Sequence, residues 1–169
     1  MNISRALLFV GILFITIMPF LSSCDRRPPE VKEIEALQVK AETGDVGAQV
    51  SLASKYYEGQ GVLEDHATAF RWYFKAAEQG NAEAQYWTGS MYHKGEGVEE
   101  DNQEAMKWHL KAAEQGYARA QCAIGYMYIS GLGVEQNYKE AMKWYLKAAE
   151  QGDAHAQNQI GYMYYKGEG

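Results

Sequence analysis

Small, apolar and polar residues recur along residues 41–169 with a period of 36. Comparing residues 77–112 with residues 113–148 gives 22 identities in 36 positions. Within each unit, apolar and small residues are spaced three, four or seven apart, which is typical of one face of an α-helix. The period therefore predicts stacked copies of one helical unit.

The repeat units occupy residues 41–76, 77–112 and 113–148, followed by a partial unit at 149–169. Each unit contains two helical segments separated by a Gly-x-Gly-Val turn. Residues 30–40 align with a second helix and are more polar, which predicts a capping half-repeat. The predicted fold is all-α, an α-solenoid of antiparallel helix pairs.

Helix ends have clear signals. Asp or Asn precedes most of the helical segments, where its side chain can accept hydrogen bonds from the first turn. Glu104 and Glu140 each stand three residues after such an N-cap residue, which predicts capping boxes. The first glycine of each turn is expected to end a helix in the left-handed conformation, and the second to lie in the loop. These structural glycines are Gly59, Gly61, Gly95, Gly97, Gly131 and Gly133.

The second helix of each unit carries a tryptophan between two alanines, at Trp72, Trp108 and Trp144. A large side chain between small ones at one helix face predicts core packing rather than a cofactor site. The same helix ends in the hexapeptide KAAEQG, at residues 75–80 in the first unit. Its lysine suits the negative end of the helix dipole. Its glutamate and glutamine, Glu78 and Gln79, are expected to face solvent.

These motifs resemble the Sel-one-like repeat (SLR) family, which is related to the tetratricopeptide repeats. The matching elements are A-x-x-x-x-G-x-M-Y-x-x-G-x-G-V, at residues 84–98 and 120–134, and E-A-M-K-W-x-L-K-A-A-E-Q-G, at residues 104–116 and 140–152. The resemblance covers residues 41–169 and implies a right-handed superhelix that acts as a protein–protein interaction scaffold.

The last unit stops inside its Gly-x-Gly turn, before a second helix. Ile160, Met163 and Tyr164 are therefore expected to lack a cover. Two explanations stay open: a shortened array, or an end that meets a partner or a second copy of the chain.

The N-terminal segment predicts a route to the cell envelope. A single Arg5 precedes an uncharged apolar run, residues 6–20, which is short for a spanning helix and suits a secretory signal. Small residues then precede Cys24, which resembles a bacterial lipoprotein signal. The resemblance implies cleavage of residues 1–23, lipidation of Cys24 and a tether at residues 24–29. An ordinary signal peptide or an uncleaved anchor helix are the alternatives.

The lipoprotein resemblance places the protein on the periplasmic side. Asp25 resembles an inner-membrane retention signal of enteric lipoproteins; otherwise the outer membrane is expected. The chain has a net charge of −6, and removing residues 1–23 takes away only Arg5. Such an acidic chain is a poor candidate for nucleic-acid binding. With Cys24 lipidated, Cys122 has no disulfide partner and is expected to pack as an inert thiol.

Catalytic and metal-binding motifs are not found in the sequence. The histidines, His66, His93, His109 and His155, occupy four different repeat positions, and no two stand three or four residues apart. We therefore expect no catalytic residues, no metal and no cofactor. The enzymatic alternative is a periplasmic protein that binds or hydrolyses β-lactams, as implied by some cysteine-rich relatives; the paired cysteines of those relatives are missing here.

Positions that vary among the units form one stripe along the first helices. The partner-binding candidates on this stripe are Tyr57, Tyr86, His93, Tyr126, Ile129, Tyr162 and Tyr165. First helices are expected to line the concave face of a solenoid, where tyrosines suit binding of a protein or peptide. Unconstrained drift of these positions is the alternative. The expected partners are thus a protein segment and the membrane, through the Cys24 anchor.

Overall fold

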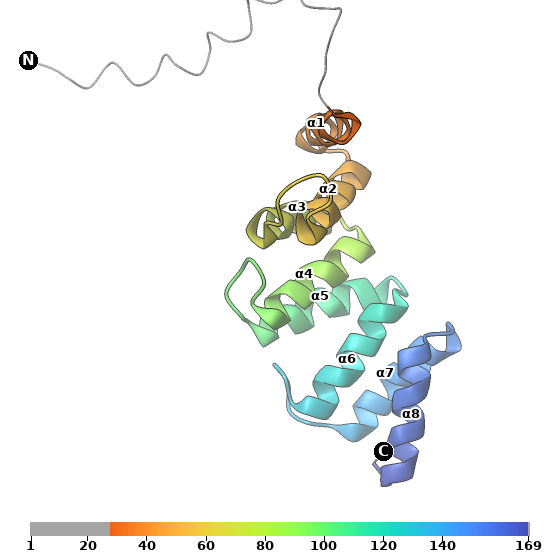
Figure 1. Ribbon diagram of the computed structural model, residues 1–169. Coiled ribbons are helices and arrows are strands. Elements are labelled where there is room, and N and C mark those ends of the chain that lie inside the picture. The colour runs from red at the N-terminus through yellow and green to blue at the C-terminus, as the bar shows by residue number, and fades with distance from the viewer. Residues whose placement is uncertain (1–27, 169) are drawn as a thin grey trace, which may run out of the picture.

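The computed structural model describes residues 28–168, and these form eight α-helices and no strand. The helices succeed one another from α1 at one end to α8 at the other, in stacked pairs (Figure 1). Contacts join each helix mainly to its neighbours in sequence, as expected for a solenoid. The helix bounds are α1 Pro29–Glu42, α2 Val46–Glu58, α3 His66–Glu78, α4 Ala82–Lys94, α5 Asn102–Glu114, α6 Ala118–Ser130, α7 Tyr138–Glu150 and α8 Ala154–Lys166.

Helix ends follow the sequence signals with one exception. The first helices α2, α4, α6 and α8 each end at a glycine with φ between 67° and 71°. The carboxylate of Asp101 accepts a hydrogen bond from the backbone N–H of Glu104 at 3.0 Å. The reciprocal bond of both predicted capping boxes is absent, because the Glu104 carboxylate pairs with Lys107 and the Glu140 carboxylate pairs with Lys143, each at 2.6 Å. The N–H of Asp101 donates instead to the carbonyl of Tyr92.

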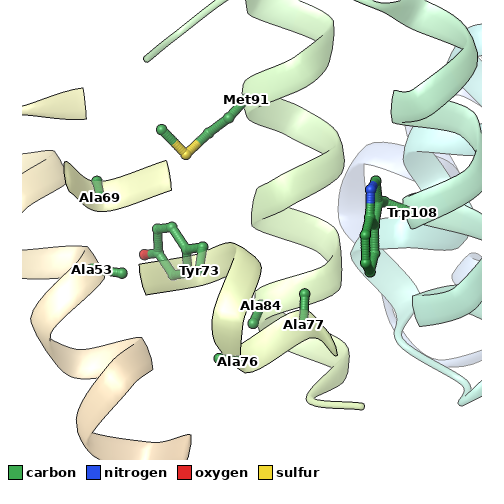
Figure 2. Packing of buried hydrophobic residues seen from close by; sticks show 8 residues of the cluster. All are labelled: Ala53, Ala69, Tyr73, Ala76, Ala77, Ala84, Met91 and Trp108. Carbon is green, nitrogen blue, oxygen red and sulfur yellow. The ribbon is translucent and has the colours of Figure 1, made fainter. Parts of the chain in front are cut away.

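The buried aromatic residue of each second helix lies one position after the tryptophan. Tyr73 and Tyr145 are 2% and 1% exposed, and His109 holds the equivalent place in α5 at 2%. Figure 2 shows Tyr73 of α3 pointing toward Ala53 of α2. In the next units a glycine replaces that alanine: a Cβ on Gly89 would lie 2.9 Å from the His109 ring. Small residues on the first helices therefore make room for these rings.

The prediction of core packing holds for Trp108, which belongs to the buried core, whereas Trp72 and Trp144 lie at its edge. Trp108 is 7% exposed, whereas Trp72 and Trp144 are only half-buried. The lysine of each KAAEQG hexapeptide covers its tryptophan, with the ammonium 3.8 to 4.4 Å from the ring centroid. Such cation–π contacts shield the rings from solvent.

Glutamine side chains connect the helices in a repeated network that the sequence analysis missed. Gln49 donates from Nε2 to the carbonyl of Ala41 at 3.0 Å, which joins α2 to the preceding helix. Gln79, the glutamine of KAAEQG, donates to Gln49 Oε1 at 2.7 Å. The same two bonds recur with Gln85 and Gln115 and with Gln121 and Gln151. Gln79 is exposed, as predicted, and its side chain in addition joins two helices.

The second glycine of each turn permits contact between units. A Cβ on Gly97 would lie 2.2 Å from the carbonyl oxygen of His66, and a Cβ on Gly133 would lie 2.2 Å from that of Asn102. Each loop therefore rests directly on the first residue of the preceding second helix. A side chain at these glycines would force the two backbones apart.

The last helix, α8, is partly covered. Tyr164 is 72% exposed, as predicted, but Met163 is fully buried and Ile160 is half-buried. Met163 packs with Tyr145 and Ala156, so the preceding helix α7 already covers it. The expectation that Met163 lacks a cover is wrong, because this side chain points back toward the stack.

Candidate functional site

Tyr57, at the start of the predicted stripe, is a contact between repeats. Its hydroxyl donates to Glu96 Oε2 at 2.7 Å, and Glu96 lies in the loop of the next unit. Its ring lies 4.9 Å from His66 and 5.3 Å from Trp87, measured between centroids. Burial, followed by the hydrogen bond to Glu96, raises the pKa of Tyr57. These bonds hold Tyr57 in place, so its aromatic face is largely occupied.

Tyr86 and His93, on α4, are also half-buried. Tyr86 contacts Tyr117 of the next unit, with ring centroids 5.5 Å apart. His93 donates from Nδ1 to Asn102 Oδ1 at 2.6 Å and lies edge-on to Tyr126 of α6, 6.0 Å away. The stripe is thus continuous from one first helix to the next.

The exposed members of the stripe lie toward the C-terminal end. Tyr126, Tyr162 and Tyr165 are 48%, 54% and 85% exposed. Ile129 is half-buried against the core of the third unit. Exposed tyrosines supply large contact area with little side-chain entropy to lose, which favours recognition of another protein.

A pocket of about 440 Å³ opens on this stripe, between α6, the start of α8 and Tyr86 of α4. Two tyrosines, a cysteine and an alanine line it together with two charged side chains and an imidazole. The lining residues are Tyr86, Arg119, Cys122, Ala123, Tyr126, Asp153 and His155. Of these residues, Tyr86 and Tyr126 are predicted as partner-binding candidates from the sequence, and the others are not. A comparison of equivalent positions in successive units would have shown that an acidic Glu83 is followed by a basic Arg119 and then by His155.

Cys122 lies in this pocket as a half-buried free thiol. Burial raises the pKa of Cys122 to about 12, and the neighbouring Asp153 carboxylate, through its charge and a hydrogen bond, adds to the rise. The thiol therefore stays protonated at neutral pH and is a weak nucleophile. This environment agrees with the packing role expected from the sequence.

His109 is a buried, neutral imidazole. It is 2% exposed, and burial, with a smaller effect from His93, lowers its pKa to about 4. Its Nδ1 has no hydrogen-bond partner among the described residues. No group of three or more potential metal ligands is present in residues 28–168. Cys24, the predicted lipidation site, lies outside the described residues.

Among helices α1 to α8, none has both the length and the apolar character that a membrane span requires.

The stacked helix pairs define an α-solenoid repeat protein. The sequence profile of the Sel1 repeat matches residues 46–81, 82–117, 118–153 and 154–169. The chain therefore belongs to the Sel1 repeat family, whose members are generally protein–protein interaction scaffolds.

Solved structures agree with this assignment. A protective antigen of uropathogenic Escherichia coli strains with an SLR fold is 43% identical; the match covers 83% of this chain and 30% of that one, with a TM-score of 0.80. A Sel1 repeat protein from Oxalobacter formigenes is 40% identical, with 82% and 60% covered and a TM-score of 0.70. This chain thus corresponds to about a third of the first and 60% of the second protein's length.

The cysteine-rich protein B of Helicobacter pylori is 24% identical over 76% of this chain and 92% of its own, with a TM-score of 0.59, and it shares the fold. No match was found among curated proteins. The comparisons give no support to the enzymatic alternative.

Proposed function

We propose that this protein is a membrane-tethered adaptor that binds a segment of a partner protein along the stripe of its first helices. The observation that carries the proposal is the exposure of Tyr126, Tyr162 and Tyr165 on successive first helices. Exposed aromatic side chains in one row cost little to order and bury much area on binding. The neighbouring pocket adds a concave place for a side chain of the partner.

The tether would be the lipid on Cys24, on the periplasmic side of the bacterial envelope. Helix α1 begins at Pro29, and the five residues from Cys24 to Pro28 span at most about 17 Å. The N-terminal end of the solenoid would then stay close to the bilayer, with the stripe leading away from it. Asp25 favours the inner membrane.

The test is cross-linking in membranes of cells that produce the tagged full chain, followed by affinity purification. We expect a discrete partner with the native chain and its loss with Tyr126→Ala combined with Tyr162→Ala. The thermal unfolding curve of this variant should stay unchanged, since both side chains are about half exposed. Equal capture by both chains would overturn the proposal, and a collapse of the melting curve would show that the tyrosines are core residues.

A second candidate is self-association through α8. A Cβ on Gly161 would meet no described atom within 4 Å, whereas the equivalent Gly89 and Gly125 lie under rings. This face of α8 is thus open among the described residues. Light scattering of the full chain should then show a concentration-dependent dimer that Gly161→Trp weakens; a strict monomer would exclude this role.

A further inference from the structure

The pocket between α4, α6 and α8 exists because three positions that carry aromatic residues in one pair of units carry smaller residues 36 positions later. Its residues Cys122, Ala123 and Asp153 correspond, 36 positions earlier, to Tyr86, Trp87 and Tyr117. At those earlier positions the three rings pack together. The centroids of Tyr86 and Trp87, and those of Tyr86 and Tyr117, are each 5.5 Å apart.

The equivalent place therefore holds aromatic rings in one repeat and is open in the next. Tyr86 and Tyr126 stand at the pocket as ring-bearing walls, and Tyr126 occurs where the earlier unit has Ser90. Aromatic rings favour other rings at this spacing in offset or edge-on contact. An aromatic side chain is thus the kind of group that the pocket fits.

The charge at the rim also differs between the units. Arg119 and His155 occupy the repeat position that Glu83 holds in the second unit. Arg119 forms no ion pair with a residue of the range 28–168; its side chain contacts the Tyr117 hydroxyl. Asp153, the acidic residue of the pocket, is already engaged, because its Oδ1 accepts from the N–H of Ala156 at 2.8 Å. The guanidinium of Arg119 is therefore available to a carboxylate of a ligand.

We infer that this pocket binds an aromatic side chain of an extended partner segment that carries a carboxylate next to it. The aromatic ring lies between Tyr86 and Tyr126, over Ala123, and the carboxylate pairs with Arg119. The inference rests on the proposed adaptor function and gives the chemical class of its partner: an aromatic–acidic motif in a protein segment.

The probe is a fluorescein-labelled, C-terminally amidated peptide GGWDGG, with GGADGG and GGWKGG as comparisons. Fluorescence anisotropy with the full chain in detergent measures binding. We expect GGWDGG to bind at least about tenfold more tightly than either comparison peptide. Equal binding of GGADGG would overturn the role of the ring, and no saturable binding up to about 1 mM would overturn the inference.

Two variants use residues that the chain itself carries at equivalent positions. Ala123→Trp fills the pocket with the residue found at position 87, and Arg119→Glu introduces the residue found at position 83. The first should weaken GGWDGG binding about tenfold or more, and the second should shift the preference to GGWKGG. Ser51→Trp is the matched control, because it places a tryptophan at the same repeat position on α2, and it should bind like the native chain.

If circular dichroism shows that Ala123→Trp folds poorly, the test rests on Arg119→Glu, because Arg119 is exposed and its replacement should leave the fold intact. A folded Ala123→Trp chain with native binding, or an unchanged preference of Arg119→Glu, would refute the pocket assignment. If a partner cross-links equally to the native chain and to Ala123→Trp, the adaptor function stands and the pocket inference fails. If GGWDGG binds as expected but no partner is captured in membranes, the pocket stands and the adaptor function fails.

Discussion

Replacing His109 with tyrosine should remove a loss of stability at acidic pH. Tyr73 and Tyr145 fill the same place in the units on either side, and Gly89 leaves room for the ring as Gly125 does for Tyr145. The Tyr73 hydroxyl forms a hydrogen bond with Ser54. Ser90 occupies the position equivalent to Ser54, so it can serve a tyrosine at position 109 in the same way.

The expected magnitude follows from the pKa of His109. Burial lowers it from 6.5 to about 4, so the folded chain binds fewer protons than the unfolded chain between these values. Stability therefore falls as the pH drops below 6.5, and the full effect is reached below about pH 4. This difference in the His109 pKa between the unfolded and folded chains corresponds to about 3 kcal/mol of unfolding free energy. Tyr86 and His93 face the imidazole, and neither supplies a negative charge at this pH that would stabilise the protonated form.

The assay is denaturant unfolding of the native chain and of His109→Tyr between pH 8 and pH 4. The difference in unfolding free energy between the two chains should grow by up to about 3 kcal/mol as the pH falls. His155→Tyr is the matched control, since His155 is exposed, and its curve should run parallel to that of the native chain. Parallel curves for His109→Tyr would show that position 109 is not the source of the acid sensitivity.

Three further substitutions test the repeat architecture and the anchor. Gln85→Leu removes the bond from Gln85 to the Ala77 carbonyl and the bond from Gln115 to Gln85, and it should cost about 1–2 kcal/mol by denaturant unfolding. Gln157→Leu, at the exposed end of the network, should cost under about 0.5 kcal/mol, and equal losses for the two variants would count against the network. Gly133→Ala places a Cβ 2.2 Å from a carbonyl oxygen, whereas the Cβ of Gly152→Ala would meet no atom within 4 Å. The first variant should therefore lower the melting temperature much more than the second. Equal decreases in melting temperature would contradict the close approach at Gly133. Cys24→Ser should abolish incorporation of labelled palmitate and release the chain from the membrane fraction, and continued incorporation would exclude Cys24 as the lipidation site.

Periodicity in the sequence was sufficient to predict the helices, their order and their ends, because each unit repeats the same starters and glycines. It could not identify which of two adjacent aromatic positions is buried. Trp72 and Tyr73 both recur near alanines, and only the packing of α3 against α2 shows that Tyr73 points inward. The role of Gln79 was also invisible, because its partner Gln49 is 30 residues away and joins it only when the helices pack.

The candidate site was predicted in part. Variation between units identified the tyrosine stripe, yet it did not separate residues that bind neighbours, such as Tyr57, from exposed ones, such as Tyr162. The pocket was not predicted for a physical reason. Small side chains such as that of Ala123 leave the cavity open, and an alanine has no functional group that would mark a site in the sequence. Only its alignment with Trp87 shows how much volume is lost.

The departures from the repeat fall into two physically different groups. Thr88 and His109 place polar groups in the core of the second unit, and Thr88 Oγ1 and His109 Nδ1 have no partner among the described residues. Such groups cost stability, since their equivalents Ile124 and Tyr145 are better suited to burial. The changes at Arg119 and Ala123 line the surface pocket. The repeated glutamine hydrogen bonds and the glycine contacts between units do not involve these two residues. Substitution there can alter binding at little cost to folding. Function in this chain is therefore expected where the repeat varies at the surface, and acid sensitivity where it varies in the core.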